Sequence, residues 1–232
     1  MPIARIGEFL RADDIGITPM LGIESSNILP CVAEIKRLKI KGIFGCPAFG
    51  FTEANLDFLH ELPQLIQIWF WEVSLRDIRG IYALHNLQLF NVHNRTQGID
   101  FLRLSKLKKV IWRYQPKDTG LDQLPELERL DVWHFNPKSK TFSDCQVSSG
   151  LKHLEINWAN PSTLDGLPHM PLLKELQLHY CRNLTSLDGL DRIAPNLERL
   201  IVACSKQCKD TAAIGNLADL KHVFINKSAN AG

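Results

Sequence analysis

The chain has 232 residues, of which 45% are hydrophobic, so it is long enough to bury a large core. Its 27 Lys and Arg residues nearly balance its 25 Asp and Glu residues, and this balance argues against a global positive field that would attract nucleic acid or an anionic membrane. No stretch approaches the roughly 20 consecutive apolar residues that span a bilayer, and the first residues lack the pattern of a secretory signal. We therefore expect a cytoplasmic protein that binds neither nucleic acid nor a membrane.

The first 39 residues carry no regular repeat, and we expect residues 1–39 to form an N-terminal cap. Residues 26–38 have apolar side chains at helical spacing, which predicts a helix. Ser25, Ser26 or Asn27 is available as its capping residue. The apolar residues of 40–45 predict a first, degenerate strand. After it, Thr52 is expected to cap a short helix that carries Leu56 to Leu62.

From residue 65 onward, a leucine repeatedly precedes a second apolar residue by three positions and a third by five. These leucines recur at intervals of 20 to 24 residues, at Leu65, Leu87, Leu107, Leu127, Leu151, Leu173, Leu197 and Leu220. The second and third apolar positions predict a short strand, because alternate residues share one face of a strand. A further apolar cluster after each strand predicts a return segment. Neither part buries its apolar face alone, so residues 40–232 are expected to stack as an array of about nine strands in one elongated domain.

The phrases LDGLPHMPLLKELQLHYCRNLTSLDGL and LDQLPELERLDVW resemble leucine-rich repeat proteins of the short-repeat bacterial or internalin-like type. The resemblance covers residues 40–226 and implies an α/β solenoid. Such a solenoid has a curved parallel sheet on its concave face and short helical or irregular returns on its convex face. The family usually carries Asn or Cys three residues after the last apolar strand position. Here only Cys181 fits, because the other positions are Val73, Arg95, Gln115, Phe135, Ala159, Ser205 and Ser228, so we expect irregular loops.

The strand residues beside and between the core positions are expected to face the concave side. The candidate partner-binding residues are Trp69, Trp71, Leu89, His93, Lys109, Ile111, Arg113, Arg129, Asp131, Trp133, Glu155, Asn157 and His179. Exposed apolar side chains of this kind mark a contact surface, and Trp and Arg are enriched at interface hot spots. An alternative is that the N-terminal cap, or the long loop after Trp133, folds back over the tryptophans. Sugar stacking on the tryptophans and phosphate binding by Lys109, Arg113 and Arg129 are weaker alternatives.

Nothing in the sequence indicates catalysis, a metal or a cofactor. The six cysteines form no CxxC pair, and Cys204 and Cys208 lack a second pair or a nearby histidine at ligand spacing. No GxSxG, HExxH, P-loop or dinucleotide-binding fingerprint occurs. We therefore expect a binding protein rather than an enzyme.

The predicted function is that of a protein-protein interaction module that binds one specific protein on its concave face. The resemblance to bacterial repeat proteins suggests an immunity protein that neutralises a toxin. The alternative is an adaptor, regulatory subunit or effector recognition domain that recruits an enzyme. A monomer is expected, with self-association through the last strand, residues 221–226, as a further hypothesis because Phe224 lies on an uncovered edge. The long polar segments 135–149 and 205–214 are expected to project as loops, where function is often found.

Overall fold

The computed structural model describes residues 3–14 and 16–226. The chain divides into two compact units, residues 1–110 (unit 1) and 111–232 (unit 2). Within the described ranges, no helix is both long and apolar enough to cross a membrane.

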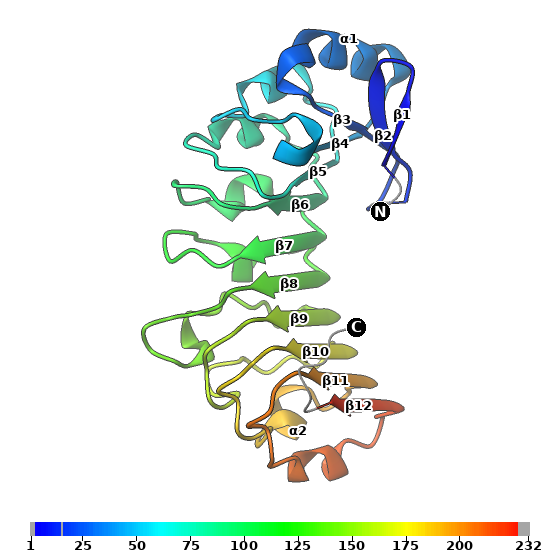
Figure 1. Ribbon diagram of the computed structural model, residues 1–232. Helices are drawn as coiled ribbons and strands as arrows, with labels where there is room; N and C mark the ends of the chain where they lie inside the picture. Colours follow the sequence, from blue (N-terminus) through cyan, green and yellow to red (C-terminus); the bar gives the residue numbers. More distant parts are fainter. Residues whose placement is uncertain (1–2, 15, 227–232) are drawn as a thin grey trace. The chain divides into compact units, whose positions relative to one another are not determined.

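Unit 1 begins with an antiparallel hairpin and continues as a parallel array. Strands β1 (Ile3–Ile6) and β2 (Phe9–Ala12) pair antiparallel, and β2 pairs antiparallel with β3 (Met20–Gly22). From β3 onward the pairing is parallel, through β4 (Gly42–Gly45), β5 (Gln67–Phe70) and β6 (Leu89–Val92). The array therefore starts one strand earlier than the sequence predicts, inside the segment that was assigned to the cap (Figure 1).

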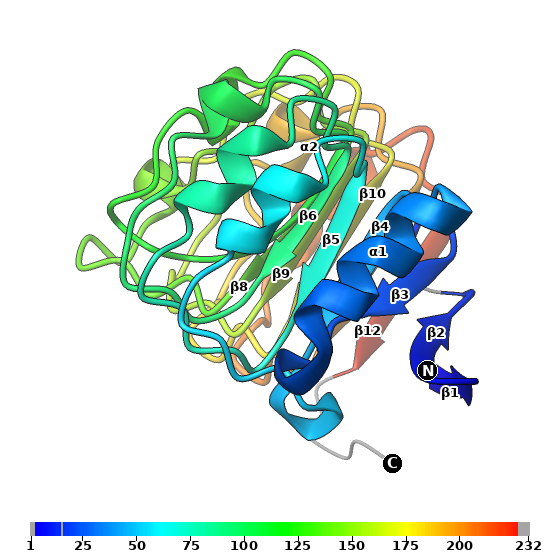
Figure 2. The same cartoon turned by 90° about the horizontal axis from the view of Figure 1, so that it is seen from above.

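The predicted N-terminal helix is present as α1 (Ile28–Leu38), preceded by a 3₁₀ turn at Ser25–Asn27. It buries Cys31, Val32 and Ile35, and it ends where Lys39 adopts the left-handed conformation. The next helical segment is a 3₁₀ turn at Asp57–Glu61 whose N-cap is Leu56, so the prediction that Thr52 caps it is wrong. Figure 2 shows the short helical returns of unit 1 on one side of β5 and β6 and the β1–β2 hairpin on the other.

Unit 2 repeats the same plan with parallel strands only. Strand β7 (Lys109–Arg113) crosses the boundary between the units. It is followed by β8 (Arg129–Trp133), β9 (His153–Asn157), β10 (Glu175–His179), β11 (Arg199–Ala203) and β12 (His222–Asn226). From β8 to β12 each strand pairs in register with the next. The returns contain a 3₁₀ turn or the short helix α2 (Leu190–Ile193), except the one between β9 and β10, which has neither.

The apolar columns read from the sequence form the core. The first core position of each strand is buried at Ile68, Phe90, Val110, Leu130, Leu154, Leu176 and Leu200, and the second at Phe70, Val92, Trp112, Val132, Ile156, Leu178 and Val202. The nine predicted strands are β4 to β12, so the leucine-rich repeat α/β fold is confirmed, and the additional strands all come from residues 3–22. The exceptions lie in β12, where Val223 is 49% exposed and Ile225 is half-buried.

At the position that the family fills with Asn or Cys, the side chains of Cys181 and Ser205 contact backbone groups of the chain. The Cys181 thiol lies 3.7 Å from the backbone oxygen of His179, and the Ser205 hydroxyl accepts a hydrogen bond from the Cys181 amide. Val73, Phe135 and Ala159 fill the same position with buried apolar groups. Ser228 lies outside the described residues.

A second repeating feature is a left-handed residue two positions after the last core residue of the strand. This conformation occurs at Glu72, His134, Trp158, Tyr180 and Cys204, with φ between 53° and 57°. Non-glycine residues rarely adopt it, at a cost of roughly 1 kcal/mol or more each. The column places their side chains at corresponding points of successive repeats.

Candidate partner-binding surface

The predicted tryptophan surface of unit 1 is covered by the N-terminal segment of the same chain. Trp69 and Trp71 are half-buried rather than exposed, and they pack against a cluster of Leu10, Ala12, Met20 and Phe44. Trp71 stacks on Phe44 with ring centroids 5.9 Å apart. Of the alternatives open from the sequence, the one in which the N-terminal cap folds over the tryptophans is confirmed for these two residues.

Two further contacts hold this segment in place. Gln67 is fully buried, and its side-chain oxygen accepts a hydrogen bond from the Ile17 amide at 2.6 Å while its nitrogen donates to the Thr18 carbonyl at 2.5 Å. The Arg5 guanidinium makes two hydrogen bonds, of 2.8 and 3.1 Å, to the Glu24 carboxylate. Residues 3–14 and 16–18, which we call the N-terminal strap, are therefore anchored at both ends.

The strap also explains why Leu89 is not available to a partner. Leu89 is only 1% exposed, contrary to its predicted outward exposure. A methyl group placed on Gly16 would lie 3.4 Å from Leu89 Cδ1, which shows that the strap backbone runs directly over this side chain. The remaining unit 1 candidates, His93 and Lys109, are half-buried, and the His93 ring accepts a hydrogen bond from the Glu72 amide at 3.4 Å.

In unit 2 the strand face that turns away from the core, here called the outer face, carries a connected polar network. Arg129 donates to Asp131 at 2.8 Å and to Glu155 at 3.1 Å, and Asn157 donates to the other Glu155 oxygen at 2.9 Å. Burial by itself would lower the pKa of Arg129, but the nearby Asp131 and Glu155 carboxylates outweigh it and raise that pKa. Arg129 therefore stays charged at any physiological pH and fixes the geometry of β8 and β9.

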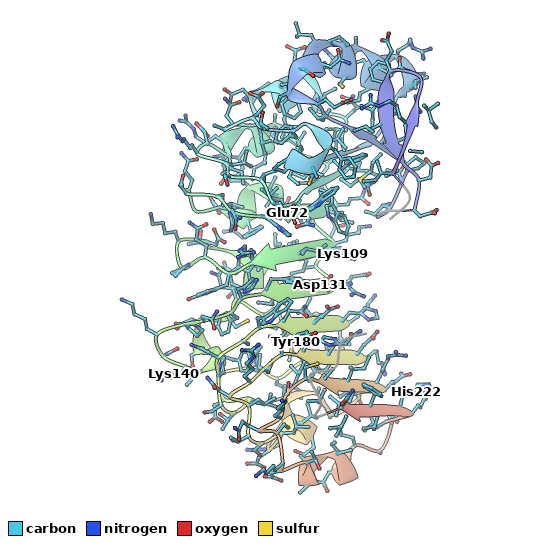
Figure 3. All side chains as sticks on the ribbon, viewed as in Figure 1. Glu72, Lys109, Asp131, Lys140, Tyr180 and His222 are labelled. Carbon is cyan, nitrogen blue, oxygen red and sulfur yellow. The ribbon has the colours of Figure 1, made fainter. Side chains whose placement is uncertain are left out.

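A second polar cluster spans β9, β10 and β11. Glu175 on β10 contacts His153 at 3.3 Å and Arg199 at 3.2 Å, and it accepts a hydrogen bond from Gln177 at 2.6 Å. The Gln177 side-chain oxygen lies 2.9 Å from His179 Nε2. The two clusters thus make a preorganised polar surface over β8 to β11; Figure 3 labels Asp131, which lies on it. Six of the predicted candidates belong to these strands: Arg129, Asp131, Trp133, Glu155, Asn157 and His179.

Three predicted candidates of unit 2 are more buried than a freely exposed surface would allow. Ile111, Asp131 and Asn157 are 8%, 6% and 5% exposed. For Asp131 and Asn157 the reason is the network itself, because Arg129 covers the first and Glu155 pairs with the second. Arg113 is half-buried. These residues support the surface and offer only part of their area to a partner.

An aromatic column at the ends of the strands was not identified from the sequence. His134 stacks on Trp158 at 5.3 Å, and Trp158 stacks on Tyr180 at 4.7 Å, with interplanar angles of 7° and 9°. Trp133 packs beside Trp158 at 5.3 Å. The sequence contains a clue to this column, because His134, Trp158 and Tyr180 stand at the same position of their repeats. In the structure that position is left-handed.

The electrostatics of the column keep its rings neutral. Burial, and then the nearby Arg113 guanidinium, lower the pKa of His134, so its imidazole is uncharged near pH 7. The hydrogen bond between the Tyr180 hydroxyl and Cys204 raises the pKa of Tyr180. The column is therefore an apolar and half-buried strip beside the charged network. Among the described residues, no group of three or more His, Cys, Asp or Glu side chains is placed to hold a metal ion.

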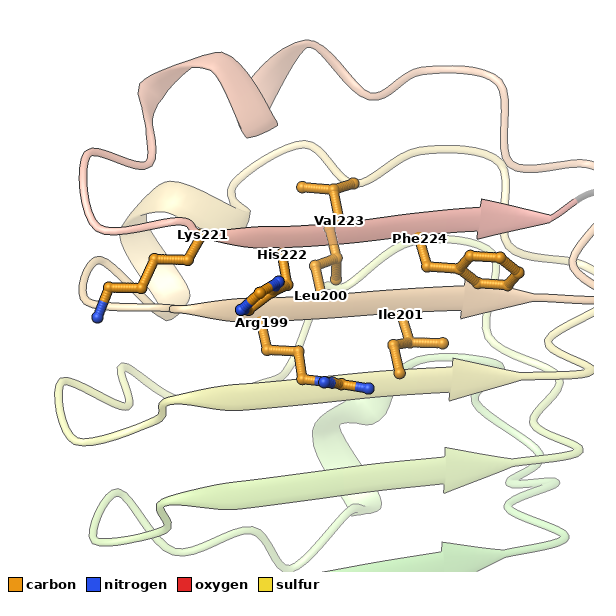
Figure 4. A pocket seen from close by; sticks show the side chains of 7 residues that line it. All are labelled: Arg199, Leu200, Ile201, Lys221, His222, Val223 and Phe224. Carbon is orange, nitrogen blue, oxygen red and sulfur yellow. The ribbon is translucent and has the colours of Figure 1, made fainter.

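The last strand presents a third surface. Val223 and Phe224 of β12 are 49% and 54% exposed, and with Ile201, Arg199 and His222 they line a shallow hollow of about 350 Å³ (Figure 4). Among the described strands β12 pairs only with β11. Self-association through this edge stays a hypothesis.

Comparisons with known proteins give structural likenesses only. No protein-family model matches the chain, and no curated protein matches it. Among solved structures the chain is similar to an internalin from Listeria monocytogenes str. 4b F2365, at 14% identity and a TM-score of 0.43, over 79% of this chain and 65% of the internalin. It is also similar to the leucine-rich repeat ectodomain of the plant membrane receptor kinase GASSHO1/SCHENGEN3 from Arabidopsis thaliana, solved in complex with CASPARIAN STRIP INTEGRITY FACTOR 2. That match has 14% identity and a TM-score of 0.43, over 89% of this chain and 26% of the ectodomain.

A third likeness is to a TLR13–ssRNA13 complex, at 13% identity and a TM-score of 0.27, over 73% of this chain and 44% of the other. The chain spans less than two thirds of the length of each of these three proteins.

Proposed function

We propose that this leucine-rich repeat chain is a protein-binding module whose partner lies against the outer face of β8 to β11 in unit 2. The observation that carries the proposal is the position of Trp133, half-buried between the Arg129 network and the aromatic column. A preorganised polar surface beside an aromatic strip has the composition of an interface centre with a polar rim. The tryptophans of unit 1 play no part in this proposal, because the N-terminal strap occupies their face.

Protein binding is favoured over sugar binding by the packing of Trp158. A sugar ring needs a free aromatic face, but both faces of the Trp158 ring are taken, one by His134 and the other by Tyr180. Trp158 therefore presents only its ring edge to a ligand. Edges and half-covered rings suit the side chains of a protein partner, which fill irregular gaps between them.

Binding is also favoured over catalysis. Asp131 and Glu155 both bind Arg129, and Glu155 also accepts a hydrogen bond from Asn157. Glu175 pairs with Arg199. None of these three carboxylates is therefore held apart as a free acid or base. We assign the surface a recognition role in which the network sets orientation and Trp133 supplies apolar contact.

The test compares Trp133→Ala with Leu172→Ala in affinity capture from the source organism, followed by titration calorimetry on each recovered protein. Leu172 is a matched control, because it is an apolar residue of unit 2 that is 53% exposed on a return segment. We expect Trp133→Ala to weaken binding by about 2 kcal/mol, roughly 30-fold, and Leu172→Ala to leave it unchanged. Equal affinity for wild type and Trp133→Ala would refute the proposed surface.

We further propose a cytoplasmic bacterial immunity role, in which the partner is a toxin. The alternative is an adaptor that recruits an enzyme. Gene neighbourhood separates the two, because an immunity gene is expected beside its toxin gene. Co-expression is the functional check: the chain should rescue growth of cells that express the neighbouring gene, and Trp133→Ala should not. If cells that express the neighbouring gene grow normally without this chain, the immunity role is excluded.

A further inference from the structure

The long loop after β8 forms a groove that none of the surfaces above includes. The groove holds about 620 Å³ and lies between residues 114–116 on one side and residues 136–146 on the other. Its lining includes Tyr114, Pro116, Pro137, Lys138, Asp144 and Gln146. Figure 3 labels Lys140 at the tip of this loop, which projects away from the strand that carries Asp131. We call this hollow the loop groove.

The walls of the loop groove are fixed by contacts to the core. The Tyr114 ring packs edge-on against Trp112 and Phe135, with centroids 5.5 and 4.7 Å away, and Phe135 stacks on Phe142 at 5.5 Å. Trp112, Phe135 and Phe142 are all fully buried. Tyr114 is therefore the half-exposed end of an aromatic series that begins in the core, and its position is set before any ligand arrives.

The opposite wall is fixed by hydrogen bonds. The Gln146 side chain accepts from the Leu121 amide at 3.1 Å and donates to the Asp118 carbonyl at 2.6 Å. The Ser139 hydroxyl donates to Asp144 at 2.8 Å. A preformed groove of this kind binds without the entropy cost of ordering its own loop.

The lining chemistry suits an extended proline-containing segment. The half-buried Tyr114 ring and the exposed Pro116 form an apolar wall with the buried Pro137 beneath it, and aromatic-lined grooves of this type accept polyproline II helices, which carry little ordering cost of their own. Burial, and then the Asp144 carboxylate, raise the pKa of Tyr114, so its hydroxyl remains a hydrogen-bond donor. A polyproline helix leaves its carbonyl groups free to accept such a bond.

The charges of the groove have no counter-ion among the residues that the structure describes. Among the described residues, Asp144 forms no ion pair and is hydrogen-bonded only to the neutral Ser139 hydroxyl. Lys138, on the same loop, is exposed and likewise forms no ion pair in that part of the chain. The groove therefore presents one unpaired anion and one unpaired cation beside an apolar surface.

From these observations we infer that the loop groove binds an extended, proline-containing segment of a partner protein that carries one basic and one acidic residue. The prolines pack on Tyr114 and Pro116. The basic residue pairs with Asp144 and the acidic residue with Lys138. This site is separate from the outer face, so its occupancy does not depend on the proposed function.

The probe is a fluorescein-labelled peptide, Arg-Pro-Leu-Pro-Pro-Leu-Pro-Glu, titrated with the full chain in fluorescence polarisation. Its control, Arg-Ala-Leu-Ala-Ala-Leu-Ala-Glu, keeps the charges and removes the prolines. We expect saturable binding of the first peptide only. Tyr114→Phe, which keeps the ring packing and removes the hydroxyl, should weaken binding about two- to twelvefold, the usual range for one hydrogen bond. Leu172→Ala is the control variant that should bind as wild type does.

A charge reversal provides the decisive arm. Asp144→Lys should bind the Arg-bearing peptide about two- to fivefold more weakly, as for loss of an exposed ion pair. The same variant should bind a peptide that has Glu in place of Arg more tightly than the wild type does. Circular dichroism establishes that each variant is folded. The inference is overturned by absent or non-saturable binding, by equal binding of the proline-free peptide, or by an Asp144→Lys variant that does not distinguish the two charges. A result confined to this peptide leaves the outer-face measurement with Trp133→Ala unaffected, so the two proposals fail independently.

Discussion

Replacing Gln67 by Leu should release the C-terminal end of the N-terminal strap while leaving the repeat array folded. Leu has nearly the volume of Gln but makes neither the 2.6 Å hydrogen bond to the Ile17 amide nor the 2.5 Å bond to the Thr18 carbonyl. Each such bond contributes about 0.5–1.5 kcal/mol net, so the two together stabilise the closed strap by about 1–3 kcal/mol. The backbone groups that lose them are near the surface and become hydrated when the segment opens.

Native-state hydrogen exchange measures this directly. A loss of about 1–3 kcal/mol makes the Ile17 amide exchange about 5- to 150-fold faster, because each 1.4 kcal/mol is about a factor of ten. The Tyr180 amide, which donates to the Ala203 carbonyl in unit 2, is the internal control and should exchange as in the wild type. An Ile17 amide that exchanges at the same rate in both proteins would show that Gln67 does not hold the strap.

Three further outcomes test the core, the charges and the last strand. Leu130→Ala should cost about 2–5 kcal/mol in urea unfolding, because Leu130 is fully buried and the change leaves a cavity; a cost below 1 kcal/mol would contradict the column assignment. Lys221 and then Lys174 hold the pKa of Glu198 at about 2, against an ordinary value of 4.5. The stability difference between wild type and Glu198→Gln should therefore be full above about pH 4.5, shrink as the pH falls and vanish only below about pH 2, and a difference that is undiminished below pH 2 would refute it. If β12 mediates self-association, Phe224→Lys should abolish a dimer seen by multi-angle light scattering at high concentration, whereas a wild type that is monomeric throughout would exclude it.

The repeat array was predictable because its signal is local. Each strand is encoded by alternation within five residues, and the buried columns from Ile68 to Val202 follow from that alternation alone. The burial of Trp112 also follows from this alternation. Its partner Asp118, which accepts the indole hydrogen bond at 2.6 Å, lies in the following loop and leaves no periodic trace.

The exposure of Trp69, Trp71 and Leu89 was not predictable in the same manner. What covers them is the strap, and the contact that fixes it joins Gln67 to Ile17, residues 50 apart in the chain. No periodicity relates such segments. The aromatic column is an intermediate case, because His134, Trp158 and Tyr180 recur at one repeat position, yet their left-handed backbone is needed to turn three loop residues into a stack.

The antiparallel pairing at the start of unit 1 limits how a chain of this kind lengthens during evolution. A duplicated repeat supplies a strand that runs in the common direction, and it is readily accommodated between two parallel neighbours such as β4 and β5. Strands β1 and β2 break that common direction. The edge of β3 that does not face β4 is already paired with β2. New units therefore have to be inserted downstream of β3, so the N-terminal end is expected to stay fixed among descendants while the number of repeats that follow it varies.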